Sequence, residues 1–177
     1  MSGSLVYYLG LGANLGDRAA ALAEAVRRLD GDPRLTVAQV SPVYETAAVA
    51  DEPQPDYLNL VVAVRTDLEP AAMLSVTQGI EGALGRTRPY HHAPRTLDID
   101  LLVCIAAVAP GGIMAATAEL TLPHPRLLER QFVLQPLADL APDLRVGQAP
   151  PVGELVDRSA PGVRRLGELA ALTGADE

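Results

Sequence analysis

The spacing of apolar positions along the chain predicts alternating strands and helices between residues 5 and 105. Runs rich in apolar and β-branched residues at 5–11, 35–44, 57–65 and 97–105 are typical of strands. Two segments between these runs place apolar residues at i, i+3, i+4 and i+7, the spacing of one helix face. The first lies around 22–29, with Asn14 or Asp17 as its candidate cap, and the second begins at Pro70.

The order of these elements predicts an α+β fold with a ferredoxin-like βαββαβ core. In that plan an antiparallel sheet carries both helices on one face. The opposite face must then be covered by later residues or serve as a binding surface. We expect further strands and helices after residue 105 to extend the core, including a helical stretch over 126–140 that Pro136 interrupts.

Prolines and glycines mark the expected loops and boundaries. Pro42 predicts an edge or a bulge near the end of the second strand, and 47–56 is expected to be an exposed loop. Gly10 and Gly12 do not continue as G-x-G-x-x-G, so a dinucleotide site is disfavoured and a tight turn or a close backbone approach is favoured. We expect one domain over 1–146, with 147–177 as its C-terminal appendage.

Composition and charge exclude several classes of function. The chain has 177 residues, 49% hydrophobic and 20% charged, which is typical of a folded protein. Its net charge of −8 disfavours nucleic-acid binding. Its longest apolar run is far shorter than the roughly 20 residues of a membrane span. We therefore expect the protein to bind neither nucleic acid nor a membrane. The sequence has no signal peptide pattern and a single cysteine, Cys104, which favours the cytoplasm. Every basic residue is arginine, so mechanisms that need a catalytic lysine are excluded.

Two neighbouring features are candidates for phosphate chemistry. No acidic residue lies between Glu81 and Asp98, whereas three arginines and two histidines do, which indicates an anionic ligand or a solvated loop. Asp98 and Asp100 then alternate with apolar residues, so a strand would project both carboxylates to one side. Such a pair binds Mg²⁺ when phosphates and water complete the coordination. The alternative is a half-exposed strand with two solvated aspartates.

Other candidate residues lie further along the chain. His124 stands between two prolines, as a surface residue or a ligand contact. Tyr57, Asn59 and Phe132 could form a stacking slot with an amide for a planar heterocycle, or they could be ordinary core residues.

Six ordered blocks resemble the 6-hydroxymethyl-7,8-dihydropterin pyrophosphokinase family of folate biosynthesis. They are YLGLGANLGD at 8–17, SPVYET at 41–46, QPDYLN at 54–59, QGIE with GRTR over 78–88, APRTLDIDLL at 93–102, and LTLPHPR with RQFVL over 120–134. The resemblance covers roughly residues 5 to 143. It implies transfer of the β,γ-pyrophosphate of ATP to the pterin hydroxymethyl group, with release of AMP, by a protein that we expect to be a monomer.

The resemblance also implies roles for individual residues. Asp98 and Asp100 would hold two magnesium ions, and together with Arg86 and Arg95 they form the implied catalytic set. The implied ATP-binding residues are Gln78, Glu81, Arg88, Arg95, Leu101, Thr121, His124 and Arg130. The implied pterin-binding residues are Thr46, Tyr57, Asn59 and Phe132.

Two other classes of function remain open at this point. A nucleotidyltransferase could use the same Asp-x-Asp pair, but it would leave Tyr57, Asn59 and Phe132 without a role. A small-molecule-binding module without catalysis is the second alternative.

Overall fold

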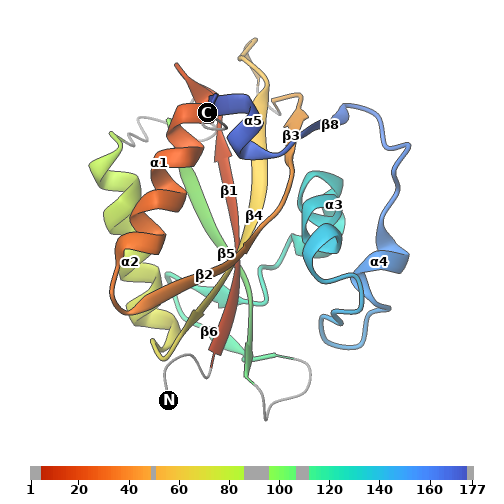
Figure 1. Cartoon of the computed structure of the whole chain (residues 1–177). Coiled ribbons are helices and arrows are strands. Elements are labelled where there is room, and N and C mark those ends of the chain that lie inside the picture. Colours follow the sequence, from red (N-terminus) through yellow and green to blue (C-terminus); the bar gives the residue numbers. More distant parts are fainter. Residues whose placement is uncertain (1–4, 49–50, 86–95, 107–111, 175–177) are drawn as a thin grey trace.

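A computed structural model describes residues 5–48, 51–85, 96–106 and 112–174. One antiparallel sheet runs through the centre of this part of the chain (Figure 1). Its strand order is β5-β1-β4-β3-β8, and β2 also pairs with β4. The six strands are β1 (Leu5–Ala13), β2 (Leu35–Val40), β3 (Val43–Thr46), β4 (Tyr57–Thr66), β5 (Asp98–Ala106) and β8 (Val163–Gly167).

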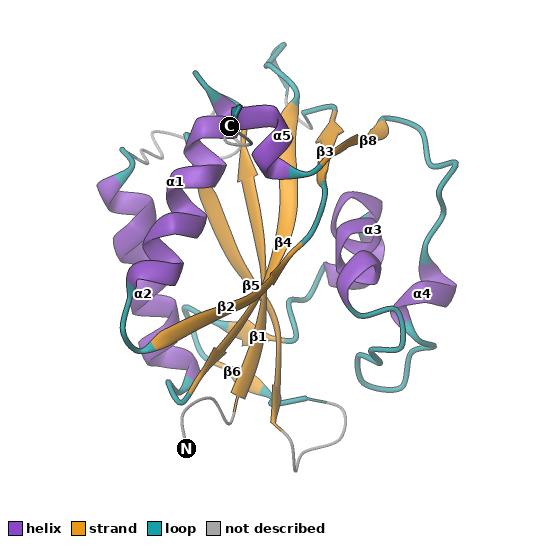
Figure 2. Ribbon diagram, viewed as in Figure 1, coloured by secondary structure: helices purple, strands orange, loops and turns teal. Residues whose placement is uncertain are grey.

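Helices lie on both sides of this sheet (Figure 2). The helices α1 (Arg18–Gly31) and α2 (Pro70–Ala83) cover one side, and α3 (Gln131–Leu140) and α4 (Val152–Leu155) lie on the other. The small elements are η1 (Leu127–Glu129), α5 (Leu169–Thr173) and a separate two-stranded sheet of β6 (Ala115–Ala116) and β7 (Thr121–Leu122). No helix of the described residues is long and apolar enough to cross a membrane.

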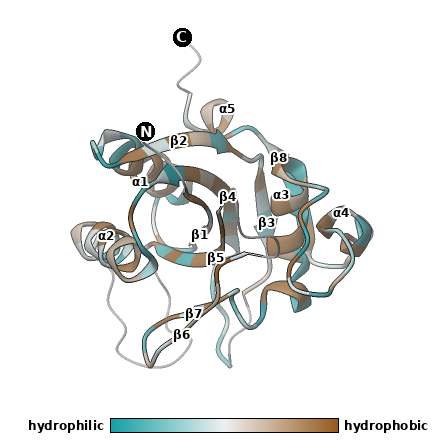
Figure 3. Ribbon diagram, turned by 90° about the horizontal axis from the view of Figure 1, so that it is seen from below, coloured by the Kyte–Doolittle hydropathy of each residue, from teal (hydrophilic) through white to brown (hydrophobic). Residues whose placement is uncertain are grey.

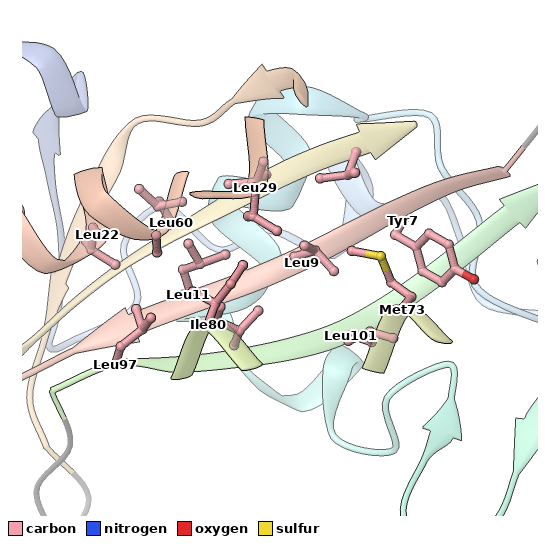
Figure 4. Packing of buried hydrophobic residues seen from close by; sticks show 14 of the residues in the cluster. Tyr7, Leu9, Leu11, Leu22, Leu29, Leu60, Met73, Ile80, Leu97 and Leu101 are labelled. Carbon is pink, nitrogen blue, oxygen red and sulfur yellow. The ribbon is translucent and has the colours of Figure 1, made fainter. Parts of the chain in front are cut away.

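The βαββαβ core and its antiparallel sheet are confirmed. In the first helix Leu22, Ala25 and Leu29 are buried, as their spacing predicts, and they pack with alternate residues of β1 and β4 (Figure 4). Asp17 is the cap of α1, because its Oδ1 accepts a hydrogen bond from the Ala20 N–H at 3.0 Å. Burial of this apolar cluster joins both helices to the sheet.

The second strand of the core is divided at Ser41 and Pro42. Proline cannot donate a ladder hydrogen bond, so the strand breaks into β2 and β3 at the position where Pro42 predicts an irregularity. Ser41 bridges the break, because its N–H donates to the Val61 carbonyl at 2.9 Å and its Oγ accepts from the Val61 N–H at 2.8 Å. Pairing with β4 therefore continues through the break.

The interruption expected at Pro136 is wrong. The helical stretch breaks at Arg130 instead, and α3 runs through Pro136 to Leu140. Proline inside a helix forfeits one backbone hydrogen bond. Pro136 is buried, and its neighbours Leu134 and Leu137 pack in a cluster that includes Val61 of β4, so tertiary packing offsets the loss.

The sheet face away from α1 and α2 is covered in part by later residues, as one of the two expectations has it. A second apolar cluster, which includes Val61, Val103 and Leu137, covers one part of it. Figure 3 shows α3, which contributes to this cluster, beside the sheet. The rest of that face borders a cavity.

Residues 147–177 were expected to be an appendage, and the structure places part of them in the main sheet. β8 pairs antiparallel with β3, so that Thr46 lies opposite Val163 and Tyr44 opposite Arg165. Part of the segment 147–177 thus forms an edge strand of the sheet, β8. We call residues 155–163, which lead from α4 into β8, the strap.

Candidate active site

A cavity of about 510 Å³ opens on the sheet face beside α3. Five of the sheet strands (β1, β3, β4, β5 and β8), the start of α3 and the strap all contribute to its wall. The residues of this wall that the sequence singled out are Gly10, Gly12, Thr46, Tyr57, Asn59, Asp98, Asp100, Arg130 and Phe132. One cavity therefore brings together the predicted carboxylates and all four predicted pterin-binding residues.

Two glycines of β1 form the floor of the cavity. Gly12 pairs with Asn59 on one side and Asp98 on the other, while Gly10 lies between Val61 and Asp100. Cross-strand partners project to the same face of a sheet, and the side chains of Leu102 and Asn59 lie close over Gly10 and Gly12, where a Cβ would stand 3.3 Å and 2.9 Å from them. This is the close approach that the two glycines indicate, and it lies inside a strand instead of a turn.

Alanine at position 12 is expected to impair the site more than the fold. A Cβ there would lie 2.9 Å from Oδ1 of Asn59, closer than real contacts allow, so the amide must shift. We expect Gly12→Ala to raise by about tenfold the KM for any planar heterocycle that binds in the cavity as a substrate, the cost of roughly 1.4 kcal/mol of lost contact. Steady-state kinetics and thermal unfolding check this, with the exposed Gly79→Ala on α2 as control. An unchanged KM in Gly12→Ala would contradict it.

Asp98 and Asp100 lie at the start of β5 with both carboxylates on the cavity wall. Between them Ile99 is 4% exposed in the core, so the predicted alternation is confirmed. The Ile99 N–H donates to Oε1 of Glu81 at 2.8 Å. Glu81 of α2 is only 3% exposed, and its buried carboxylate holds the start of β5 in place on the side of the sheet that α2 covers.

The donor set of the cavity fits a hard cation that shares its coordination with a ligand. Among the described residues, no group of three or more histidine, cysteine, aspartate or glutamate side chains is placed to enclose a metal ion. Two carboxylates alone suit Mg²⁺, because this ion keeps several waters and takes other oxygens from phosphates. A zinc site would need more protein ligands.

His124 lies beside this carboxylate pair. Its backbone N–H donates to the Leu102 carbonyl of β5 at 2.7 Å, and its ring Nδ1 accepts from the Arg126 backbone N–H at 3.2 Å. Burial lowers the pKa of His124, the charge of Arg130 lowers it further, and the charge of Asp98 opposes both. An accepting Nδ1 on a neutral ring leaves the proton on Nε2, so His124 can donate to an anion.

Arg130 separates η1 from α3 and lines the cavity. Its guanidinium carbon is 5.6 Å from the centre of the Phe132 ring. Burial lowers the pKa of Arg130, but guanidinium remains charged in proteins. The cavity therefore places a permanent cation and an aromatic ring side by side.

The predicted aromatic and amide residues come from three elements. Tyr57 begins β4, Phe132 lies in the first turn of α3, and both are partly buried. Asn59 donates from Nδ2 to Oγ1 of Thr46 on β3 at 2.8 Å. This bond orients the Asn59 amide at the cavity wall, where a planar heterocycle with hydrogen-bonding edges could bind.

Other predicted residues lie elsewhere. Gln78 is exposed on α2 and Thr121 is exposed on β7. Leu101 is 3% exposed and packs in the cluster under α1 and α2, so only its backbone could reach a nucleotide. The described residues therefore give the cavity no side chain from these three. The predicted residues Arg86, Arg88 and Arg95 lie outside the described residues.

Several wall residues escaped sequence reasoning. Arg126, Glu129 and Gln131 flank Arg130, and their positions follow from the break between η1 and α3. Ala160, Pro161 and Val163 come from the strap, and no local pattern marks them as binding residues. The i, i+2 spacing of Gly10 and Gly12 was a usable signal, because it predicts a side-chain-free stripe on one face of a strand.

Comparisons with known proteins identify relatives. A family model described as 7,8-dihydro-6-hydroxymethylpterin-pyrophosphokinase matches residues 8–142. The chain is 45% identical over 140 residues to the 2-amino-4-hydroxy-6-hydroxymethyldihydropteridine pyrophosphokinase of Methylorubrum extorquens, covering 79% of this chain and 85% of that protein. It is 42% identical over 135 residues to the Bacillus subtilis protein of the same name, covering 76% of this chain and 77% of that one.

A solved structure shares the fold. HPPK-DHPS of Plasmodium falciparum aligns with a TM-score of 0.68 at 14% identity, covering 93% of this chain and 49% of that one. This chain therefore spans about half the length of that protein.

Proposed function

Since the chain belongs to the 7,8-dihydro-6-hydroxymethylpterin-pyrophosphokinase family, we propose that it transfers a pyrophosphoryl group to 6-hydroxymethyl-7,8-dihydropterin in folate biosynthesis. ATP is the proposed donor, and AMP is the proposed leaving product. The observation that carries the proposal is a single cavity that holds an aromatic and amide half beside a pair of carboxylates.

The pterin is proposed to bind in the half of the cavity formed by Tyr57, Phe132, Asn59 and Thr46. Its flat ring suits the two aromatic side chains, which gain stacking and apolar contact area. Its amide-like edge suits the Asn59 amide, whose orientation the bond to Thr46 fixes. A planar heterocycle with both donors and acceptors matches this set better than an apolar ligand.

The triphosphate is proposed to bind beside Asp98 and Asp100. Arg130 and His124 lie next to this pair, one as a permanent cation and the other as a neutral donor through Nε2–H. Charge-assisted hydrogen bonds of this kind are roughly twice as strong as neutral ones. The roles of Arg86, Arg88 and Arg95 rest on the resemblance alone.

Asp98 and Asp100 are the residues that would hold magnesium, and the resemblance implies two ions. When bound, magnesium supplies neutralisation of the triphosphate charge. Gly10 and Gly12 carry no side chain of their own, so the Leu102 and Asn59 side chains bound the cavity there, beside the carboxylates.

In the proposed reaction the hydroxymethyl oxygen forms a bond to the β-phosphorus of ATP. The bond between that phosphorus and the oxygen bridging it to the α-phosphorus breaks, and its electron pair leaves with AMP. The hydroxyl proton passes to water. No covalent bond to the protein forms, so the residues act by holding the two substrates in line and by balancing charge in a site sheltered from water.

We propose that the protein acts as a monomer in the cytoplasm. The buried free thiol of Cys104 is compatible with a reducing compartment. The boundary between a domain over 1–146 and an appendage over 147–177 stays a prediction.

Nucleotide product analysis tests the proposed function. Purified protein is incubated with ATP, Mg²⁺ and 6-hydroxymethyl-7,8-dihydropterin, and the nucleotides are separated, with each component omitted in turn. We expect AMP only in the complete mixture. Release of pyrophosphate would identify a nucleotidyltransferase, ADP would identify another kinase reaction, and ATP binding without turnover would identify a binding module.

A further inference from the structure

Part of the cavity wall comes from the strap, which lies outside the family match over 8–142. Val163 pairs with Thr46 across β3 and β8, and both side chains line the cavity. Pro161 lines it as well, and the Gly162 carbonyl accepts a hydrogen bond from the Ala47 N–H at 3.3 Å. The strap therefore lies directly against the strand that carries Thr46.

One face of α3 holds the strap in place. Gln131, Gln135 and Asp139 are spaced four residues apart, so they form one stripe along the helix. Each binds the strap: Gln131 donates to the Leu155 carbonyl at 3.0 Å and accepts from the Asp157 N–H at 2.9 Å, Gln135 donates to the Asp157 carbonyl at 2.9 Å, and Asp139 pairs with Arg158 at 2.9 Å.

Arg158 also ties the strap to the sheet. It donates to the Tyr44 hydroxyl at 2.7 Å, and that hydroxyl donates to Asp139. The Tyr44 residue is 0% exposed, so the contact lies at the edge of the core. Further along, Arg164 of β8 pairs with Glu45, which also accepts from Arg18 at 3.0 Å. The strap therefore has a defined position, because charge-assisted hydrogen bonds hold it through Arg158 and hold the strand that follows it through Arg164.

We propose that the strap is a specificity-determining wall of the pterin site, in which Val163 and Pro161 limit the size of groups on the ring edge that faces Thr46 and Asn59. This inference rests on the proposed function, because that function places the pterin's amide edge there. Side chains directly opposite on neighbouring strands have Cβ atoms about 4.5–5.5 Å apart, so a group added to the pterin 2-amino nitrogen would meet Val163.

An apolar wall discriminates by volume. One methylene in such a pocket typically changes selectivity by about 10–200-fold. We therefore expect the wild-type protein to bind 6-hydroxymethyl-7,8-dihydropterin at least tenfold more tightly than its 2-N-methyl analogue. Removing two methyl groups from the wall should reduce that preference.

Val163→Ala is the test variant, and Leu166→Ala is its matched control. Both shorten an apolar side chain of β8, but Leu166 packs with the cluster on the opposite face of the sheet. Titration calorimetry measures the dissociation constants of the pterin and of the analogue for each protein. We expect Val163→Ala to lower the wild-type preference at least threefold, while Leu166→Ala keeps the wild-type ratio even where its unfolding temperature falls.

A second pair of variants tests the attachment of the strap. Arg158→Gln removes the charged bonds to Tyr44 and Asp139, and the exposed Arg145→Gln serves as the control. We expect Arg158→Gln to weaken pterin binding about fivefold with the dissociation constant of ATP unchanged. A purely structural role would move both constants together.

The outcomes separate the strap from the proposed function. Equal selectivity in Val163→Ala and Leu166→Ala, or a wild-type protein that does not distinguish the two pterins, would overturn the role of the strap. A wild-type protein that binds the pterin but forms no AMP would overturn the proposed reaction, and the binding ratios would still decide the role of the strap. Absence of pterin binding to the wild-type protein would overturn both.

Discussion

Asparagine in place of Asp98 or Asp100 is expected to reduce turnover by roughly a thousandfold or more. Each substitution keeps the shape of the side chain and removes one negative charge from the pair on the cavity wall. Loss of a group that organises transition-state charge typically costs about 10²–10³ in rate, and loss of a metal-binding carboxylate should cost at least as much. Initial rates of AMP formation at saturating substrates measure the effect.

The controls for this prediction separate chemistry from folding. Asp143→Asn changes an exposed aspartate on the loop after α3 and should retain wild-type turnover. Thermal unfolding should show that the Asp98 and Asp100 variants stay folded, because both side chains lie at the cavity and not in the core. Near-normal turnover in both variants would refute the assignment of this pair.

Phe132→Ala is expected to weaken pterin binding by about tenfold to a hundredfold and to leave ATP binding unchanged. The ring lies in the first turn of α3 at the cavity, and stacking of a base on an aromatic side chain contributes about 1–3 kcal/mol. Because the ring is only partly buried, its loss should cost little stability. Fluorescence or calorimetric titration with each substrate separately measures the two affinities.

A matched control lies on the same helix. Leu140→Ala removes a partly buried apolar side chain that packs in the cluster around α3. It should lower the unfolding temperature without changing pterin affinity. Equal losses of pterin and ATP affinity in Phe132→Ala would argue against a stacking slot.

Local pattern was sufficient for the elements of the core. In α1 and α2 the apolar spacing coincides with the buried face, because burial against a single sheet is what produces that spacing. The Asp98–Asp100 pair was predictable for the same reason, since strand alternation alone determines which side chains share a face.

Where the sequence pattern predicted a residue's structural role wrongly, tertiary packing determined that role. Pro136 continues a helix because its neighbours are buried against β4. Asn14, a candidate helix cap, is instead 1% exposed and donates to Gln54 and to the Pro55 carbonyl. A polar residue beside a loop carries no local signal of the partner that it will find about 40 positions away.

The strap shows the limit of sequence reasoning for the site. Its cavity residues are an alanine, a proline and a valine, which are ordinary wall residues without chemical signature. Their position depends on pairing between β3 and β8, and a five-residue strand with two arginines gives no indication of its partner. Only the three-dimensional arrangement reveals that they face a ligand site.

The pairing of β8 with β3 also has a consequence for the order of folding. The ion pair between Glu45 and Arg164 joins residues 119 positions apart, whereas Thr46 and Asn59, which it flanks, are 13 apart. Closing the longer loop costs more chain entropy, so such contacts tend to form late. We therefore expect the β3–β4 hairpin to form before β8 adds Val163 to the cavity wall.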